Sequence, residues 1–550
     1  MLSPAAIPLD SHDPYAREAQ TFPVLGPEQM ARIAAYGHEA QVADGEMLFT
    51  RGQRGVDCLL ILAGEIEILD IASDGSATVF TTHGAGQFTG EMDLFNNRQI
   101  LVSGRARGTT RVIRLPRADF RRMIAAESDI AEIMMRAFIL RRVALIRHAQ
   151  GGVVLVGPAH GADTLRLQRF LTRNGYPHRL LDTEADPDAG GFLEGFAIAP
   201  DQLPVVIMPG AELLRRPATH ALADALGITE ALDPAQVHDL LVVGAGPAGL
   251  AAAVYGASEG LRTIVIEGVA PGGQAGTSSK IENYLGFPTG ISGQALAGRA
   301  QAQAQKFGAR LAISRSATAI DCSRRPFVVQ LEDGQAVQAR SIVIASGATY
   351  RRLTVPGYDR YEGAGIHYAA TAMEGALCSN EEVVVVGGGN SAGQAAVFLS
   401  GLARHVHIMV RADGLAATMS DYLVQRIHQS PAITLHTRTE ITALEGDDRL
   451  RSVTWTHADT GASETRAVGN VFVMIGAAPN TGWLGGCVAL DEKGFVLTGL
   501  DGASAYETSV PGMFAVGDVR SGSVKRVASG VGEGSVVVAA VHRFLDPALA

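Results

Sequence analysis

The segment from Asp239 to Glu267 constrains the fold of this chain more than any other. It reads as a buried strand, a glycine-rich turn, a helix, a second strand and a terminal acid. This order is the full context of a dinucleotide-binding fingerprint, in which glycines admit the pyrophosphate at the helix N-terminus and the acid binds ribose hydroxyls. The residues expected to do this are Gly244, Gly246, Pro247, Ala248, Gly249 and Glu267.

A second segment repeats the pattern. The apolar run 382–386 leads into a glycine turn and a helix of small residues, and the run 405–410 supplies the next strand. Arg411 stands where the first copy has Glu267, and a guanidinium there suits a 2′-phosphate. We therefore expect two different dinucleotides, FAD at the first turn and NADPH, with NADH possible, at the second. The second turn contributes Gly387, Gly389, Asn390, Ser391 and Ala392.

Length and composition limit the remaining possibilities. A chain of 550 residues predicts three or four domains, and the 64 glycines suit glycine-rich ligand turns. A net charge of −10 argues against a partner made of nucleic acid. No apolar run approaches the length of a membrane span, and the N-terminus lacks the features of a secretory signal. The four cysteines show neither C-x-x-C nor metal-binding spacing, so we expect no metal site and a reduced, cytoplasmic protein.

The N-terminal part, after a loose leader at 1–20, predicts a β-rich domain over 21–148. Short strands separated by Gly and Asp turns are typical of a small β-barrel or jelly roll. A helical stretch follows from Ala118 to His148. The expected strands are 47–49, 58–62, 65–71, 77–82 and 110–115.

This domain resembles the cyclic nucleotide-binding domains of bacterial catabolite-activator proteins. The likeness rests on Gly45-Glu46, the run 64–67 and the run 88–94, which contains Gly90 and Glu91. The family's phosphate-pairing arginine would fall at Ile100-Leu101, and the neighbours Arg98, Arg105 and Arg107 do not align with it. We therefore expect poor or no binding of cyclic nucleotides and a docking or dimerisation role, with a working cyclic nucleotide switch as the alternative. No DNA-binding helical pair follows.

Residues 151–229 predict a small α/β domain that resembles thioredoxin or glutaredoxin. Strands are expected at 153–156, 178–182 and 205–208, and helices at 164–173 and 218–226. Pro204 stands where that family has a cis-proline. The family's C-x-x-C would fall within 158–163, which has no cysteine, so we expect no redox dithiol in this domain.

The C-terminal half resembles bacterial thioredoxin reductase. Its motifs are Pro271-Gly-Gly-Gln, Ile281-Glu282-Asn283-Tyr284, the strand and turn at 342–348, the run 514–519 and Lys525–Ala528. The resemblance implies an FAD domain in two pieces, 238–357 and 480–550, with the nicotinamide domain, 358–479, inserted between them. It also implies further FAD-binding residues: Gly273, Gln274, Asn283, Ala345, Gly347, Gly517, Asp518, Arg526 and Val527.

Two positions depart from that family. Its catalytic Cys-x-x-Cys aligns with Ala370-Thr-Ala-Met373, and the nearby Cys378 is alone, which favours a core role over a redox role. Its basic NADPH motif is reduced to Arg411, with Asp413 nearby. His367 is a candidate proton donor near the expected junction of flavin and nicotinamide, and a packed junction residue is an equal alternative.

We therefore predict an α/β flavoenzyme with two Rossmann-like domains, preceded by the β-rich and thioredoxin-like domains. The enzyme would be a cytoplasmic homodimer that passes hydride from NADPH to FAD and on to an acceptor that the sequence does not identify. One alternative is a disulfide reductase that uses a partner's thiols. Another is a redox sensor that responds to cyclic nucleotide or nicotinamide without significant turnover.

Overall fold

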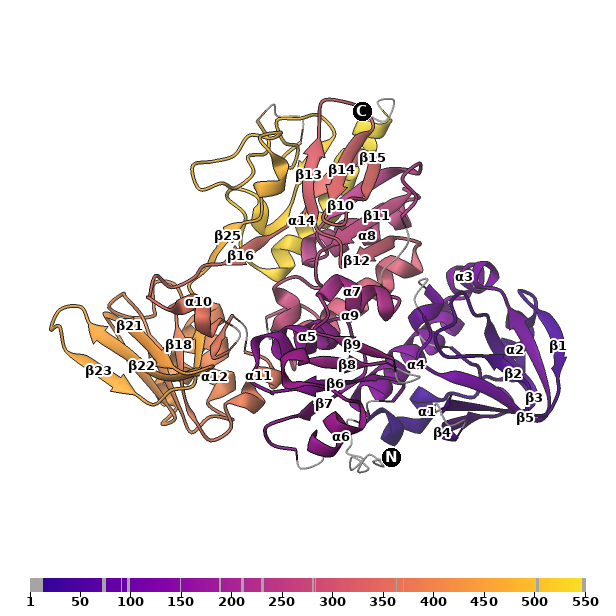
Figure 1. The fold of residues 1–550 in the computed structure, drawn as a ribbon. Coiled ribbons are helices and arrows are strands. Elements are labelled where there is room, and N and C mark those ends of the chain that lie inside the picture. Colours follow the sequence, from indigo (N-terminus) through magenta and orange to yellow (C-terminus); the bar gives the residue numbers. More distant parts are fainter. Residues whose placement is uncertain are drawn as a thin grey trace.

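The structure is a computed structural model of the whole chain, and Figure 1 shows its fold. It describes residues 13–71, 76–90, 92–95, 99–148, 150–186, 189–208, 212–228, 232–278, 281, 283–362, 364–368, 370–500 and 504–546. Glu91, Arg98 and Glu282, which the sequence motifs include, lie outside these ranges.

The N-terminal domain contains a five-stranded sheet. Its strands are β1 (His38–Val42), β2 (Met47–Phe49), β3 (Cys58–Ile71), β4 (Ala77–His83) and β5 (Ser103–Leu115), in the order β1-β5-β3-β4 with β2 on β5. The predicted runs 58–62 and 65–71 form one strand, because Gly64 at φ +85° carries the chain through an irregular pairing with β5. The sequence missed β1. The predicted helix 118–148 is two helices, α3 (Arg117–Ala126) and α4 (Ser128–Arg147), and α2 (Pro27–Ala34) precedes the sheet.

The prediction of a loose leader over 1–20 is wrong for the residues that the structure describes. A 3₁₀ turn at Pro14–Arg17 and the short helix α1 (Glu18–Thr21) pack against α4. Asp13 is fully buried and its carboxylate pairs with Arg147 at 3.1 Å and His148 at 3.0 Å. Ion pairs between residues far apart in sequence anchor this segment.

The second domain has the topology expected of a thioredoxin-like fold. β6 (Val153–Gly157) and β7 (His178–Asp182) are parallel, and β8 (Val205–Ile207) and β9 (Leu213–Arg215) are antiparallel, in the order β7-β6-β8-β9. The helices are α5 (Ala162–Arg173), α6 (Ala189–Gly195) and α7 (Thr219–Ala225). The predicted cis peptide bond before Pro204 is confirmed.

The FAD domain is built on a seven-stranded sheet from both ends of the C-terminal half. The parallel strands are β10 (Val237–Val243), β11 (Thr263–Glu267), β12 (Arg310–Ile313), β15 (Ala336–Ile344) and β26 (Met513–Ala515); β13 (Ala317–Asp321) and β14 (Phe327–Leu331) are antiparallel additions. The helices α8 (Pro247–Ser258), α9 (Gly293–Lys306) and α14 (Val527–Leu545) pack together beside it. The central residues of β10 and β11, 240–243 and 264–266, are apolar and buried, as strands covered on both faces require.

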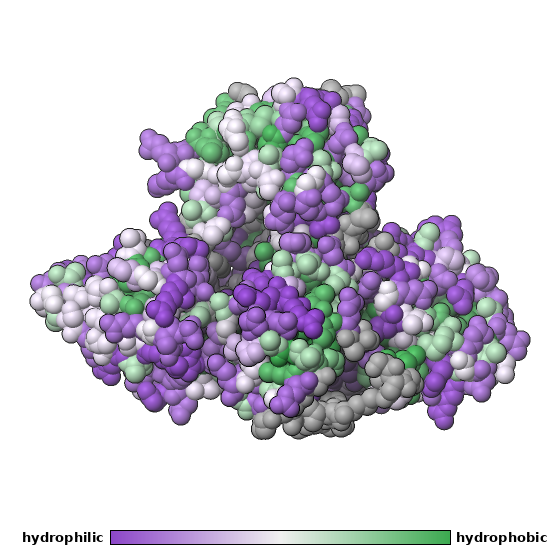
Figure 2. All heavy atoms as spheres, in the orientation of Figure 1, coloured by the Kyte–Doolittle hydropathy of each residue, from purple (hydrophilic) through white to green (hydrophobic). Residues whose placement is uncertain are grey.

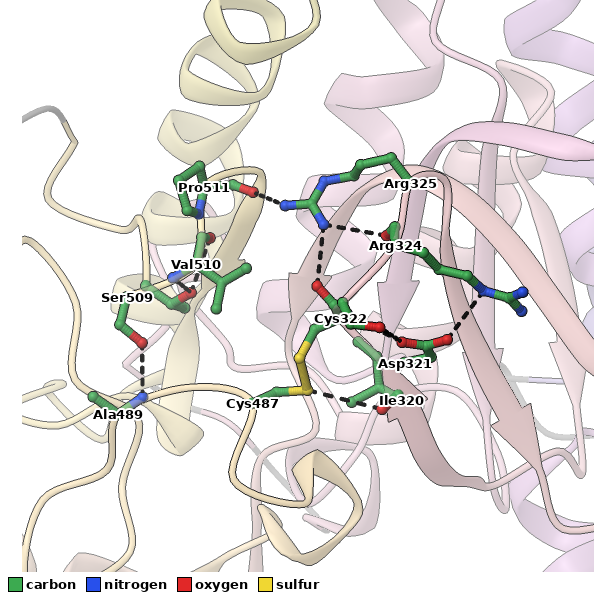
Figure 3. Close-up of a disulfide and its surroundings, with 12 residues drawn as sticks. Ile320, Asp321, Cys322, Arg324, Arg325, Cys487, Ala489, Ser509, Val510 and Pro511 are labelled. Carbon is green, nitrogen blue, oxygen red and sulfur yellow. Dashed lines mark hydrogen bonds and ion pairs between the residues drawn. A yellow bond between two sulfur atoms is a disulfide. The ribbon is translucent and has the colours of Figure 1, made fainter.

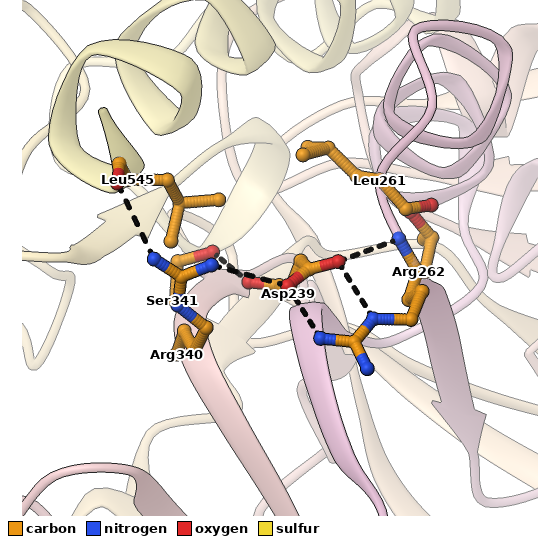
Figure 4. Close-up of polar contacts among 7 residues, drawn as sticks. Asp239, Leu261, Arg262, Arg340, Ser341 and Leu545 are labelled. Atoms are coloured by element: carbon orange, nitrogen blue, oxygen red, sulfur yellow. Dashed lines mark hydrogen bonds and ion pairs between the residues drawn. The ribbon is translucent and has the colours of Figure 1, made fainter. Parts of the chain in front are cut away.

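Asp239 of β10 is hydrogen-bonded to β15 and to the residue before β11 at one end of this sheet (Figure 4). Its carboxylate accepts hydrogen bonds from Arg262 Nε at 3.0 Å and Arg340 Nη1 at 3.4 Å, and its carbonyl accepts from Ser341 Oγ at 2.6 Å. The bonds from Arg262 lower the pKa of Asp239 to about 2. Arg340 also donates to the carbonyl of Leu545 at 3.3 Å, which connects the end of α14 to this network.

The nicotinamide domain has a second parallel sheet. The strands are β17 (Ile366–His367), β18 (Glu382–Val386), β19 (His405–Met409), β20 (Ile433–His436) and β24 (Asn470–Val473), in the order β17-β24-β18-β19-β20. Its main helices are α11 (Ala372–Leu377), α12 (Asn390–Leu399) and α13 (Asp421–Gln429), and the short α10 (Tyr358–Tyr361) precedes them. A three-stranded antiparallel sheet joins β21 (Thr439–Gly446), β22 (Leu450–His457) and β23 (Ser463–Arg466).

A two-stranded ribbon connects the two dinucleotide domains. β16 (Ala348–Tyr350) leads into the nicotinamide domain and β25 (Ala477–Pro479) leads out, and the two strands pair antiparallel. Figure 1 shows this ribbon between the FAD domain at the top and the nicotinamide domain at the left. The chain therefore enters and leaves the inserted domain at one place.

The expectation that all four cysteines are reduced is wrong. Cys322 and Cys487, 165 residues apart in sequence, form a disulfide (Figure 3). Cys322 lies just after β13 and Cys487 follows the return from the nicotinamide domain, so the bond joins the two pieces of the FAD domain. Sequence spacing could not reveal this pair, because the intervening domain separates its members.

In Figure 1 the thioredoxin-like domain lies near the centre of the molecule, with the β-rich domain on one side, the nicotinamide domain on the other and the FAD domain above it. Arg51 of the β-rich domain donates to the carbonyls of Gly151 and Gly152. Figure 2 shows hydrophilic residues over much of the nicotinamide domain and apolar residues gathered near the middle of this face. Among the described residues, no helix is long and apolar enough to cross a membrane.

Candidate dinucleotide-binding sites

The first glycine turn has the backbone geometry that a pyrophosphate needs. Gly244 has φ +105°, and a Cβ there would lie 2.3 Å from the carbonyl oxygen of Ala345. A Cβ at Gly249 would lie 1.9 Å from the carbonyl oxygen of Gly244, so only glycine lets α8 pack this closely on the turn. At Gly246, which caps α8, a Cβ would meet nothing nearer than Gly273 Cα at 3.9 Å. This open space at a helix N-terminus fits the phosphates of FAD.

Glu267 lies at the end of β11, beside this turn. Its Oε2 accepts a hydrogen bond from Ala245 N at 2.9 Å, and its Oε1 accepts from Val269 N at 3.0 Å. The carboxylate therefore shapes the glycine turn as well as offering its remaining lone pairs to a ribose. Pro247 and Ala248 begin α8, where the missing N–H of proline costs nothing.

Other residues expected at the FAD site surround the same edge of the sheet. Gly273 has φ +55°, and a Cβ there would lie 3.0 Å from Gly246 Cα; the neighbouring Gln274 donates to the carbonyl of Ala348. Ala345 N donates to Val243 O at 2.9 Å, and Gly347 takes φ +65°. Parallel strands bring these residues together because their carboxyl ends share one edge.

Asp518 follows β26 at this edge. Burial raises the pKa of its carboxyl, and the neighbouring Lys525 acts in the opposite direction. Among the described residues no group donates a hydrogen bond to this carboxylate, so it is available to a ligand hydroxyl. Arg526 caps α14 and Val527 is the first residue of that helix.

Glu533 of α14 lies at this edge as well, and the sequence analysis did not predict a role for it. Its carboxylate accepts from Gly517 N at 2.6 Å and pairs with Arg520 at 2.6 Å. Gly517 takes φ +73°, so the buried acid fixes the turn that precedes Asp518. In the sequence, the position of this acid between Gly532 and Gly534 on a mainly apolar helix is the one feature that could have indicated its role.

Asn283 does not join the other expected FAD residues. Its side chain is exposed and borders a shallow depression with four residues of α13: Tyr422, Gln425, Arg426 and Gln429. It therefore lies between the two dinucleotide domains.

The second glycine turn repeats the geometry of the first. Gly387 takes φ +141°, and a Cβ there would lie 2.3 Å from Met474 O. Gly389 caps α12, and a Cβ there would have only Thr418 O, at 4.0 Å, within reach. Asn390 Oδ1 accepts from Ser420 N at 2.7 Å. Ser391 is exposed and Ala392 is buried in the first turn of α12, so the turn fits a second dinucleotide.

Arg411 lies just after β19 and is exposed. The acid that could oppose it, Asp413, forms an ion pair with Arg438, which also pairs with Asp459 at 2.5 Å. The sequence analysis missed Arg438, which lies beyond β20 and is brought here by the bond from its N–H to Ala412 O at 3.1 Å. Because Arg438 compensates Asp413, the positive charge of Arg411 suits a 2′-phosphate.

His367 is buried against the thioredoxin-like domain. Arg169 Nη2 of α5 donates to His367 Nδ1 at 2.9 Å, so the Nε2–H donates to Asn470 Oδ1 at 2.9 Å. Burial, reinforced by Arg169, lowers the pKa of His367 to about 4. Both ring nitrogens of His367 are hydrogen-bonded to protein groups. This arrangement favours the packed junction residue over the proton donor, the two alternatives that the sequence left open.

Cys378 is fully buried in the apolar core of the nicotinamide domain. Its thiol donates to Glu374 O at 3.1 Å, and burial raises its pKa to about 12. A thiol with this pKa is not a nucleophile at neutral pH.

The β-rich domain contains a cavity of about 70 Å³ with mainly apolar walls. Ile100 and Leu101, at the position aligned with the family's arginine, form part of its wall. Arg105 pairs with Glu67 at 2.7 Å and Arg107 with Glu65 at 3.4 Å, so these neighbours are engaged elsewhere. The buried Arg141 of α4 also borders the cavity, and donates to the carbonyls of Phe88 and Gly90.

Among the residues described, no three His, Cys, Asp or Glu side chains form a group that could hold a metal ion.

Two protein families match the chain. Residues 238–534 match the pyridine nucleotide-disulphide oxidoreductases, and residues 39–127 match the cyclic nucleotide-binding domains. These matches agree with the two Rossmann-like domains and the β-rich N-terminal domain described above.

Relatives of the C-terminal half are thioredoxin reductases. The chain is 34% identical over 310 residues to the enzyme of Rickettsia felis, covering 56% of this chain and 98% of that one. It is 33% identical over 354 residues to NADPH-dependent thioredoxin reductase 3 of Arabidopsis thaliana, covering 61% of this chain and 65% of the relative, slightly less than two thirds. The crystal structure of the Lactococcus lactis thioredoxin reductase, in what its title calls the FR conformation, is similar with a TM-score of 0.52 at 31% identity, covering 56% of this chain and 99% of that one.

Proposed function

The chain belongs to the pyridine nucleotide-disulphide oxidoreductase family and is an FAD-dependent oxidoreductase, and on that premise we propose that it transfers hydride from NADPH to FAD and then passes the electrons directly to an external acceptor. The transfer uses no dithiol of this chain. The proposal extends to a homodimer, as inferred from the sequence.

The observation that supports the proposal is the position of the four cysteines. Ala370 and Met373 occupy the dithiol positions of the family in the sequence. Cys378 and Cys58 are buried in the cores of separate domains, and Cys322 is bonded to Cys487 at the outer strands of the FAD sheet. No pair of thiols is placed to relay electrons from a flavin at the first glycine turn.

The chain's own residues bind and orient the two dinucleotides. The turn at Gly244–Gly249 would hold the pyrophosphate of FAD, Asp518 would accept a hydrogen bond from a hydroxyl of its ribityl chain, and Arg411 would bind the 2′-phosphate of NADPH. Bound FAD supplies the hydride and electron chemistry, and the protein supplies orientation and electrostatics.

The two alternative functions predict different experimental results. A reductase that uses a partner's thiols would reduce thioredoxin in the presence of NADPH. A sensor would bind NADPH without turnover.

The cytoplasmic location proposed from the sequence relied on reduced cysteines, so the disulfide removes that argument for it.

Steady-state NADPH oxidation with a quinone or dye acceptor tests the proposal. Wild type and Cys378→Ser should turn over at similar rates and keep equal FAD, and wild type should reduce thioredoxin negligibly. Loss of turnover in Cys378→Ser with FAD retained would show that a thiol takes part. Absence of turnover with every acceptor, while NADPH still binds, would instead favour the sensor.

A further inference from the structure

The covalent connection between the two dinucleotide domains is the two-stranded ribbon β16·β25. An isolated two-stranded ribbon is marginally stable in water, so this connection alone does not fix the relative orientation of the two domains. Ser346 and Asn480 exchange two hydrogen bonds at its base, from Ser346 Oγ to Asn480 O at 2.7 Å and from Asn480 Nδ2 to Ser346 O at 2.8 Å. These bonds join the two chain segments to each other at the end of the ribbon next to the FAD domain.

The thioredoxin-like domain is anchored firmly on the FAD domain. Their buried apolar residues belong to one continuous cluster, which includes Leu167, Phe170 and Leu222 on one side and Leu240 and Val242 on the other. No described residue of the nicotinamide domain belongs to this cluster. The two domains therefore form a single body against which the nicotinamide domain is placed.

One end of α5 is bonded to the segment that follows β11 and lies against the first glycine turn. Arg173 Nη2 donates to Gly273 O at 3.0 Å, and Asn174 Nδ2 donates to Val269 O at 3.0 Å. Gln294 of α9 donates to the carbonyl of Thr172. The C-terminal end of α5 thus holds the segment 269–273, in which Gly273 packs against Gly246.

One turn earlier, α5 is bonded to the nicotinamide domain. Arg169 donates to His367 Nδ1 at 2.9 Å and pairs with Glu374 at 3.3 Å. His367 and Glu374 are 1% and 3% exposed, whereas the Arg169 side chain is 31% exposed, so these charge-assisted contacts are partly shielded from solvent.

We propose that Arg169 and Arg173 are positioning residues that hold the FAD and nicotinamide domains in one relative orientation. We call this arrangement, with Asn174, the α5 clamp. Residues four apart on a helix point to the same face, so one rigid element contacts both domains. A domain that resembles thioredoxin but has no dithiol would thus serve the reductase as an internal support. The proposal rests on hydride transfer between the two domains and adds a structural requirement for it.

Distance measurements between two spin labels test the clamp without relying on turnover. Gln303→Cys in the FAD domain and Asp448→Cys in the nicotinamide domain provide exposed labelling sites. The native cysteines are buried or disulfide-bonded, so the label reacts selectively at the new thiols. The wild-type background should give one narrow distance distribution, and Arg169→Ala/Arg173→Ala should give a broad or second distribution.

Arg166→Ala is the matched control. Arg166 lies on the same helix, but its bonds, to Asp163 at 3.0 Å, Thr219 Oγ1 at 2.8 Å and Pro217 O at 3.1 Å, stay within the thioredoxin-like domain. The Arg166→Ala substitution should leave the distribution of distances between the two labels unchanged. Arg169→Lys, which retains a donor for Glu374, should give an intermediate width.

The same variants separate a positioning role from a merely structural one. In the double variant, the rate at which NADPH reduces bound flavin in a single turnover should fall by roughly tenfold, as the productive orientation becomes a minor population. In Arg169→Ala, whose bonds go to His367 and Glu374 of the nicotinamide domain, FAD content and the KM for a dye acceptor should stay unchanged. An unchanged distribution in the double variant, or equal broadening in Arg166→Ala, would overturn the clamp. A broadened distribution with an unchanged reduction rate would overturn the positioning role and leave the proposed function intact.

Discussion

Single glycine positions determine whether the first turn accepts a dinucleotide. A Cβ at Gly244 or Gly249 collides with a backbone oxygen, whereas a Cβ at Gly246 enters open space. The backbone of Gly246 is extended, at φ −70° and ψ −177°, so any residue can adopt it. Cofactor binding and folding can therefore be separated at this one position.

We expect Gly246→Val to abolish FAD binding while the protein still folds. The side chain fits the empty turn but occupies the place of the pyrophosphate, which should weaken FAD binding by roughly a hundredfold or more. Absorbance at 450 nm of the purified protein gives the FAD content, and far-ultraviolet circular dichroism checks the fold. Gly298→Val, at another glycine with no atom near its Cβ, is the control. A yellow Gly246→Val protein would show that FAD binds elsewhere.

At the second turn, Arg411 should determine the choice between NADPH and NADH. A charge-assisted contact with the 2′-phosphate contributes about 1.5–3 kcal/mol, roughly a ten- to hundredfold preference. Arg411→Ala should therefore raise the KM for NADPH by that factor and leave the KM for NADH almost unchanged. Arg451→Ala, at an exposed arginine paired with Asp447, controls for loss of surface charge. Equal kinetics with both nucleotides in the wild type would contradict this assignment.

Among elements, local patterns were predicted well and long-range pairings were not. The strand, glycine turn and helix units around Gly244 and Gly387 lie within a few residues of their predicted positions, because apolar period and glycine placement are local signals. The burial of Asp13 and the bond from Arg169 to His367 depend on residues far apart in sequence. No periodicity reports such contacts, so the leader and the site of His367 could not be predicted.

The Asp239 network links four elements at the base of the FAD sheet, and its contribution to stability should depend on pH. The folded-state pKa of about 2 lies below the usual value near 3.9, so the carboxylate stabilises the fold above pH 4 and this stability is lost as pH falls toward 2. Since Arg262 is largely exposed, we expect Asp239→Asn to cost about 1–2 kcal/mol at pH 7.

Urea unfolding at pH 7 and near pH 2.5 measures this difference. The free energies of unfolding of wild type and Asp239→Asn should converge at the lower pH. Asp447→Asn, at an exposed pair, should cost almost nothing at either pH. A cost for Asp239→Asn that is the same at both pH values would mean that packing, not charge, is responsible.

The β-rich domain should not bind cyclic nucleotides at physiological concentrations. Ile100 and Leu101 stand at the position of the family's phosphate-pairing arginine, and the buried Arg141 that also borders the cavity donates to the carbonyls of Phe88 and Gly90. A phosphate at the apolar wall would therefore be poorly compensated, which is costly. Titration calorimetry with cyclic AMP and cyclic GMP should show dissociation constants no tighter than roughly millimolar. Micromolar binding would indicate that another arginine reaches the phosphate.

At the scale of the whole molecule, the disulfide closes a large loop around the nicotinamide domain. A loop of this length predicts a stabilisation of about 2–5 kcal/mol. Cys322→Ser, Cys487→Ser and the double variant should lose the same amount in chemical denaturation, because each removes the same bond. Reductant should lower wild-type stability equally. Additive losses in the double variant would mean that the two sulfurs contribute separately.

Because the chain enters and leaves the nicotinamide domain through the ribbon β16·β25, this domain could be deleted without cutting the FAD domain. Tyr350 and Ala477 are directly paired across the ribbon, so their Cα atoms lie about 5 Å apart. A gene in which a two-residue turn replaces 351–476 would join them as an ordinary hairpin and keep every strand of the FAD sheet. The shortened protein should keep its flavin site and lose only the site for the electron donor.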